Sequence, residues 1–274
     1  MEFKQAIFDM YRSGVLYGFA FAVGASVGSF LNVVIYRWPL ELSIVKPGSH
    51  CPSCRRPIPW YLNVPVLSWL MLRGRCRFCG ARISARYFLV ELGLGLWAVL
   101  GLWRFGPGLP SLACLVFGAA LVAGSIIDLD HRLLPDVITA GTIPLGIIMA
   151  FLPRTWVGPW PVDWVEALVG LAIGAGLFQL VLMVFKYATG KEGMGRGDVK
   201  LMGSIGAFLG YQAIPAVIFI ASAAGIGSWL VLAAMKKADR NYALPFGPFL
   251  SAAALIVIML RPWLQKYWII IEWV

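Results

Sequence analysis

Long apolar segments separated by short charged ones make up most of the 274-residue chain. A helix of about 20 apolar residues crosses the hydrocarbon core of a bilayer. Seven stretches approach or exceed that length: 13–36, 87–103, 105–127, 137–152, 167–185, 201–235 and 241–260. The 201–235 stretch is too long for one crossing and is interrupted near Tyr211, Gln212 and Pro215. It therefore predicts two helices, the first of them short, and the chain is expected to be an all-α polytopic membrane protein with about eight transmembrane helices.

Basic side chains collect in alternate connecting segments. Residues 37–86 carry nine Lys or Arg and one acid, Glu41, and with Arg132, 186–200 and 236–240 they hold 17 of the 23 basic residues. Cytoplasmic loops of membrane proteins carry the excess of Lys and Arg. We therefore expect all of these segments to face the cytoplasm, which requires an even number of crossings between Lys200 and Lys236.

Composition agrees with a membrane protein. The chain is 60% apolar and 13% charged, whereas soluble domains are about 45–50% apolar and about 25% charged. The net charge of +10 is interpreted as loop charge that sets topology, and no nucleic-acid partner is expected. Three parts are predicted: a first transmembrane helix at 1–37, a cytoplasmic loop at 38–86 and a transmembrane core at 87–274.

Four of the five cysteines form two closely spaced pairs, Cys51/Cys54 and Cys76/Cys79. Two Cys-x2-Cys pairs supply the four thiolates of a tetrahedral Zn²⁺ site. The cytoplasmic side is reducing and disfavours disulfides, and so short a polar loop needs a metal to fold. We expect a structural zinc site with no catalytic part, and His50 is an alternative ligand.

Two acidic clusters lie where apolar stretches end or begin. The first runs from Asp128 through Asp130 to Asp136, and the second is Asp198. Acids beside membrane segments are costly and are candidates for function. Two carboxylates held close together share a proton, so one can activate water while the other protonates a leaving group. The alternative is that the 128–136 acids are solvated charges that pair with Arg132 or Lys200.

Glycines surround the second cluster. Gly193, Gly195 and Gly197 precede Asp198, and the absence of side chains there lets a substrate backbone approach and allows unusual dihedral angles. The stretch lacks the lysine and spacing of a phosphate-binding P-loop.

These motifs together resemble a known family. Gly195-Arg196-Gly197-Asp198 matches the Gly-x-Gly-Asp signature of intramembrane aspartyl proteases, and with the segment 127–136 it is similar to the bacterial type IV prepilin peptidases. Further similar stretches are 28–37, 51–54, 63–69, 73–76 and 83–92, so the resemblance covers about residues 18–250.

The resemblance implies a bifunctional enzyme of the bacterial inner membrane. Such an enzyme cleaves the basic leader of type IV prepilins or of type II secretion pseudopilins at the cytoplasmic face, after a glycine, and then methylates the new N-terminus with S-adenosylmethionine. The catalytic aspartates of the family fall on Asp128 and Asp198, with Asp130, Asp136, Gly195 and Gly197 as supporting residues. Retention of the cysteine loop favours the two-activity form.

The methyl-donor site is less defined by sequence. The chain has no Gly-rich Rossmann-type motif, and the expectation that the 38–91 region and Glu91 bind the donor rests on their position. Three alternatives stay open: a peptidase without methyl transfer, a membrane transporter and an assembly scaffold without chemistry. Transporters place polar residues near the mid-bilayer, whereas these acids gather at one expected membrane surface. The sequence does not name the natural substrate.

Overall fold

The computed structural model describes residues 11, 14–157, 160, 162–190, 195–236 and 244–268, with the side chains of 154 and 262–268 left aside. Within these ranges the chain is helical, and no β-strand is present beyond two isolated bridges in the cysteine loop. It divides into two compact units, Met1–Ala119 and Ala120–Val274. The predicted boundaries at 37/38 and 86/87 stay predictions.

The first unit is built around two paired helices, α2 (Val15–Arg37) and α4 (Ala85–Phe105). Gly24 and Gly28 of α2 lie directly against the backbone of α4, at Leu94 and at Glu91. Small residues four apart allow two helices in a membrane to approach closely. The buried Asn32 side chain also donates to the Tyr87 carbonyl oxygen at 3.2 Å.

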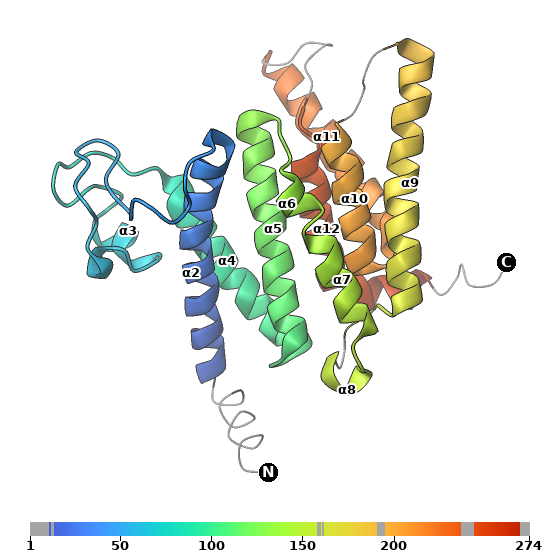
Figure 1. Ribbon diagram of the computed structural model, residues 1–274, viewed down its shortest axis with the longest axis horizontal. Coiled ribbons are helices and arrows are strands. Elements are labelled where there is room, and N and C mark those ends of the chain that lie inside the picture. Colours follow the sequence, from blue (N-terminus) through green and yellow to red (C-terminus); the bar gives the residue numbers. More distant parts are fainter. Residues whose placement is uncertain are drawn as a thin grey trace. The chain divides into compact units, whose positions relative to one another are not determined.

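The polar segment between α2 and α4 forms a small folded loop beside the ends of both helices (Figure 1). It contains η1 (Trp38–Leu40), η2 (Trp60–Leu62) and the short helix α3 (Leu67–Met71). The buried Arg37 guanidinium donates to the carbonyl oxygens of Ser43 and Pro47 at 3.0 and 2.7 Å. The beginning of the loop is therefore fixed to the end of α2.

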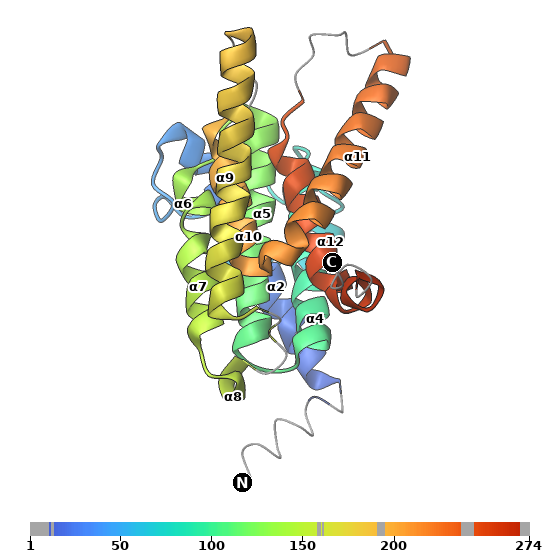
Figure 2. The same cartoon turned by 90° about the vertical axis from the view of Figure 1, so that its right-hand side faces the viewer.

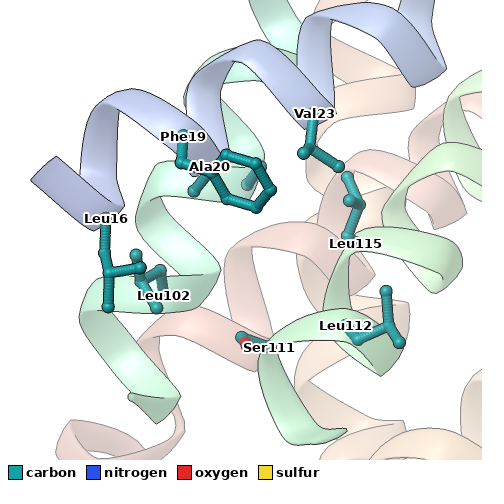
Figure 3. Close-up of a pocket in the computed structure, with 9 residues that line it drawn as sticks. Leu16, Phe19, Ala20, Val23, Leu102, Ser111, Leu112 and Leu115 are labelled. Atoms are coloured by element: carbon teal, nitrogen blue, oxygen red, sulfur yellow. The ribbon is translucent and has the colours of Figure 1, made fainter. Parts of the chain in front are cut away.

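An apolar pocket of about 190 Å³ lies near the opposite end of α2 (Figure 3). It is lined by α2, α4 and the first part of α5 (Leu109–His131). The lining residues from these three helices are Leu16, Phe19, Ala20, Val23, Ala98, Leu102, Ser111, Leu112 and Leu115. No charged side chain is among the described residues that line it.

In the second unit, the short helix α10 (Arg196–Leu209) is the centre of the packing. Every residue from 201 to 209 is buried, and α10 contacts α6 (Asp136–Thr139), α7 (Thr142–Phe151), α9 (Trp164–Thr189) and α12 (Gly247–Trp268). Figure 1 shows α7, α10 and α9 side by side.

Glycines also bring α9 and α10 together. Gly170 and Gly174 of α9 face the backbone of Gly206 and Met202 of α10. Any side chain at these positions would separate the two helices, so the close approach depends on glycine. The contact fixes where α10 lies along α9, and it therefore fixes the position of Asp198 at the beginning of α10.

The predicted interruption near Tyr211 is confirmed. After α10 ends, Gly210 takes a positive φ of 76°, and η3 (Tyr211–Ala213) leads into α11 (Ile214–Ala234), with Pro215 in its first turn. Glycine takes this backbone conformation at no steric cost. Figure 2 shows α11 inclined to α9 and leaning away from it toward its C-terminal end.

The helix pattern confirms an all-α polytopic chain. Within the described ranges, five helices are long and apolar enough to cross a membrane, namely 15–40, 85–105, 109–131, 164–189 and 211–234. Two shorter apolar helices cover 136–151 and 247–261. A small helix, α8 (Arg154–Val157), precedes α9.

Candidate active site

The two acidic clusters of the sequence meet in the second unit. Asp128 stands in the last turn of α5 and Asp198 in the first turn of α10. Their side chains are 7% and 8% exposed, and Glu91 is the one other acid that is buried among the residues described. Of the four aspartates in the two clusters, these two alone are withdrawn from the surface.

Local structure at the beginning of α10 holds Asp198 in place. Gly195 is the N-cap residue, and Asp198, the third residue of the helix, reaches back to accept a hydrogen bond from the Gly195 N–H. The side chain of the third residue makes the same hydrogen bond to the N-cap N–H in a capping box. The second oxygen, Oδ1, is buried without a hydrogen-bond partner. A buried carboxylate oxygen in that state needs a proton, a water molecule or a ligand.

Burial and, after it, the nearby charge of Asp128 together raise the pKa of Asp198 to about 6 against the opposing effect of the Gly195 N–H. Loss of hydration disfavours the charged form, and a second carboxylate disfavours it again. Asp198 therefore keeps its proton more readily than an ordinary aspartic acid, as one member of a proton-sharing pair must.

The other two aspartates lie at the surface. Asp130 is exposed, and Asp136 forms a 2.6 Å ion pair with Lys200, two residues beyond Asp198. Both partners of that ion pair are largely solvated, so it contributes about 1 kcal/mol or less. The pairing of Asp136 with Lys200 is the arrangement that the alternative interpretation of this cluster expected. It also ties the beginning of α6 to α10.

The two described glycines before Asp198 differ in their surroundings. A Cβ at Gly197 would lie 2.7 Å from the Leu134 Cβ, whereas a Cβ at Gly195 would meet nothing closer than 3.7 Å. Gly197 is therefore needed for packing against Leu134. Gly193 lies outside the described residues.

The four cysteines of the loop come together in the first unit. Their sulfur atoms all lie within 4.8 Å of one another, and the Sγ atoms of Cys51 and Cys79 are 3.8 Å apart. A tetrahedral Zn²⁺ with Zn–S bonds of about 2.3 Å places its sulfur ligands about 3.8 Å apart. The backbone N–H of Cys54 lowers the pKa of Cys51 to about 6, whereas the pKa of Cys79 is raised to about 11 because the Ala81 N–H is outweighed by burial and by contacts with the other three thiols. The arrangement fits a zinc ion.

The two cysteine pairs have the same backbone conformation. The N–H of Cys51 donates to the Arg56 carbonyl at 3.0 Å, and the N–H of Cys76 donates to the Ala81 carbonyl at 2.8 Å. In each pair the residue after the second cysteine takes a positive φ, 58° at Arg55 and 70° at Gly80. Isolated β-bridges, His50–Pro57 and Arg75–Arg82, close the two turns in the same register. His50 stays outside the sulfur cluster, and its Nδ1 lies 3.0 Å from the Gly48 carbonyl.

Comparison with known proteins gives two family matches. The bacterial peptidase A24 N-terminal domain matches residues 22–105, and the type IV leader peptidase family matches residues 115–230. A prepilin leader peptidase/N-methyltransferase of Pseudomonas putida is 37% identical over 262 residues, which cover 88% of this chain and 89% of the relative. The chain belongs to the type IV leader peptidase family.

Two further members of the family align over a similar length. A type 4 prepilin-like proteins leader peptide-processing enzyme of Escherichia coli is 38% identical over 87% of this chain and 91% of the relative. A prepilin leader peptidase/N-methyltransferase of Neisseria gonorrhoeae is 34% identical over 93% of both chains. No solved structure matches the chain.

The third buried acid of this leader peptidase homologue, Glu91, has a structural partner. Its Oε2 accepts the backbone N–H of Val66 at 2.7 Å. Val66 has φ 65° and ψ −53°, and the Leu67 N–H donates to the Pro65 carbonyl at 2.7 Å. This is a γ-turn with positive φ, a rare and strained conformation, most of all for a β-branched residue. Glu91 thus anchors the segment that leads into α3.

One residue beside the Asp128 carboxylate was not found from sequence. Gly247, at the beginning of α12, donates its N–H to the Asp128 carboxylate. The only sequence signal was a glycine between two prolines, Pro245 and Pro248, inside the predicted apolar stretch 241–260.

Proposed function

We propose that this protein cleaves the leader peptide of type IV prepilins or type II secretion pseudopilins and then N-methylates the new N-terminus. The observation that carries the proposal is the 37% identity to prepilin leader peptidase/N-methyltransferases over nearly the whole chain. A pair of buried aspartates in the matched peptidase region supports the first activity.

In the proposed cleavage, Asp128 and Asp198 form the catalytic dyad. Asp128 accepts a proton from a water molecule, whose oxygen attacks the scissile carbonyl carbon. Asp198, whose pKa burial raises to about 6, enters the reaction in its protonated form and gives its proton to the nitrogen of the leaving amine as the tetrahedral intermediate collapses. The proton that Asp128 took from water then returns to Asp198. Two carboxylates with unequal pKa values divide the base and acid roles in this way. Asp130, Asp136, Gly195 and Gly197 support the dyad without touching the reacting atoms.

We propose that Cys51, Cys54, Cys76 and Cys79 hold a structural Zn²⁺. Four thiolates fill a tetrahedral coordination sphere and leave no open position for a substrate. The ion would supply the free energy that folds a loop with few buried apolar side chains. Cys51 and Cys76, the first cysteines of the two pairs, are buried and would bind the ion from the interior of the loop.

The methyl donor in the proposed second reaction is S-adenosylmethionine, which supplies an electrophilic methyl group when bound. The acceptor is the amine that cleavage releases, so cleavage must come first on a natural substrate. We propose that the 38–91 region serves this reaction and that Glu91 contributes to it. Glu91 anchors Val66, and a carboxylate is the side chain that suits a cationic donor. The described residues that line the apolar pocket beside α2 include no such group.

The proposed topology has eight transmembrane helices and places the dyad and the zinc loop on the cytoplasmic side of the bacterial inner membrane. Its parts are residues 1–37, the loop 38–86 and the core 87–274. The support is the asymmetry of the basic residues, 17 of 23 on one side. The partners are then prepilin-type substrates and membrane lipid.

A single assay tests the two activities. Purified protein in detergent is incubated with a prepilin and S-adenosylmethionine, and mass spectrometry reports leader loss and methyl gain separately. We expect both mass changes. Leader loss without methyl gain would reduce the proposal to a peptidase, and the absence of both would favour a transporter or a scaffold.

A second assay tests whether the two reactions use separate sites. Asp198→Asn should still methylate a pilin supplied without its leader, because a carboxylate pair that moves protons has no part in transferring a methyl group. Failure of this folded variant to methylate a substrate that wild type methylates would mean that the two sites are coupled.

A further inference from the structure

Gly247, the first residue of α12, lies directly against the Asp128 carboxylate. A Cβ added at Gly247 would lie 2.7 Å from Asp128 Oδ2, closer than real Cβ atoms approach an oxygen. The N–H of Gly247 is also a hydrogen-bond donor to that carboxylate. Only glycine therefore leaves the Asp128 side chain where it stands.

The contact pairs a backbone N–H at the beginning of α12 with the Asp128 carboxylate, which can accept its hydrogen bond. The first backbone N–H groups of a helix have no partner within the helix, and the N-terminus carries a partial positive charge that favours an anion. Asp128 supplies the acceptor for the Gly247 N–H. A backbone donor does not titrate and does not change rotamer, so it fixes the direction in which the carboxylate points.

Helix α12 also contacts α10, the helix that carries Asp198. Farther along α12, the buried Arg261 guanidinium donates to the Leu209 carbonyl oxygen at the end of α10 and lies 3.7 Å from Glu166. The helix thus contacts Asp128 at its first residue and is bound to α10 at Arg261. Its position determines how the two aspartates stand relative to each other.

Leu134 fills the space between the same segments. Its Cβ lies against Gly197, beside Asp198, and its Cδ1 lies 3.2 Å from the Cβ position of Gly247. Two glycines that are far apart in the sequence therefore make room for one leucine and one carboxylate.

We propose that Gly247 is a positioning residue of the cleavage reaction, whose missing side chain and N–H hold the Asp128 carboxylate in line with Asp198. The inference rests on the proposed dyad. It assigns to the beginning of α12 a part in catalysis although that segment contributes no reacting side chain.

The test is Gly247→Ala, with Gly227→Ala as the matched control. A Cβ at Gly227 of α11 meets nothing within 4 Å, so the control makes the same chemical change in open space. A displacement of about 1 Å in a catalytic group costs about a hundredfold in rate. We expect kcat for leader cleavage to fall about a hundredfold in Gly247→Ala, with KM within about twofold of wild type, and no change in Gly227→Ala.

Further variants separate the possible outcomes. Wild-type kcat in Gly247→Ala, beside an inactive Asp128→Asn, would overturn the inference and leave the proposed function intact, whereas an active Asp128→Asn would overturn the dyad itself. Recovery of activity in Gly247→Ala with Leu134→Val would also overturn the inference, because crowding of Leu134 would then be the cause.

Methyl transfer to a pre-cleaved pilin serves as the folding readout if Gly247→Ala unfolds at a lower temperature. Retained methylation with lost cleavage supports a positioning role. An equal loss of both activities contradicts it.

Discussion

Neutralising Asp198 should make the protein more stable while removing its activity. Burial raises the pKa of this carboxyl from 3.8 to about 6. The raised value means that the folded state disfavours the charged form, so the penalty is absent below pH 3.8 and fully present above about pH 6. Two pKa units correspond to a free energy on the order of 3 kcal/mol.

Asp198→Asn keeps the shape of the side chain and an oxygen for the Gly195 N–H, but it carries no charge. We therefore expect the variant to unfold several degrees above wild type at pH 8, where wild-type Asp198 is ionised. Near pH 4 the two proteins should unfold at the same temperature. The assay is thermal unfolding of detergent-purified protein across this pH range.

Asp136→Asn is the matched control because it makes the same chemical change at an exposed aspartate that pairs with Lys200. It should lose a few tenths of a kcal/mol at pH 8 and gain nothing. If Asp198→Asn is no more stable than wild type at pH 8, Asp198 is not a buried, destabilising acid, and the proposed division of base and acid roles fails.

Three further predictions follow from the packing and the cysteine geometry. Gly197→Ala should reduce the rate of leader cleavage about a hundredfold, since its Cβ would lie 2.7 Å from Leu134. Gly195→Ala should keep a rate within a fewfold of wild type. Equal cleavage rates in the two variants would contradict this prediction. Cys51→Ser should lower zinc from about one ion per chain to near zero by metal analysis and speed proteolysis of the 38–86 loop, with a smaller effect on cleavage. Glu91→Gln should impair methylation of a pre-cleaved pilin more than it impairs leader cleavage. A larger loss of cleavage than of methylation would contradict a role for Glu91 in methyl transfer.

Local sequence patterns predicted the helices and the grouping of the cysteines well. The apolar stretches gave α2, α4, α5 and α9, because a segment that must bury its backbone polar groups in lipid forms a helix. The interruption at Tyr211 could be predicted because the apolar run was too long for one crossing. The sulfur cluster followed from spacing alone, since each Cys-x2-Cys pair is a local turn.

Contacts between distant segments could not be predicted in the same way. Nothing in the sequence near Gly247 indicates that it meets Asp128, because that contact depends on how α12 packs beside α10. The hydrogen bond from Val66 to Glu91 requires a strained turn that no local preference favours. The sequence likewise left open which aspartates were solvated, and burial of Asp128 and Asp198 with exposure of Asp130 and Asp136 separates them.

The most direct test of the account is the rate of leader cleavage in four single variants, measured by mass spectrometry on a purified prepilin. Loss of the base or of the acid costs about a hundredfold to ten-thousandfold. We predict that Asp128→Asn and Asp198→Asn are each inactive at that level while correctly folded, and that Asp130→Asn and Asp136→Asn stay within about tenfold of wild type. An inactive Asp130→Asn beside an active Asp128→Asn would contradict the account.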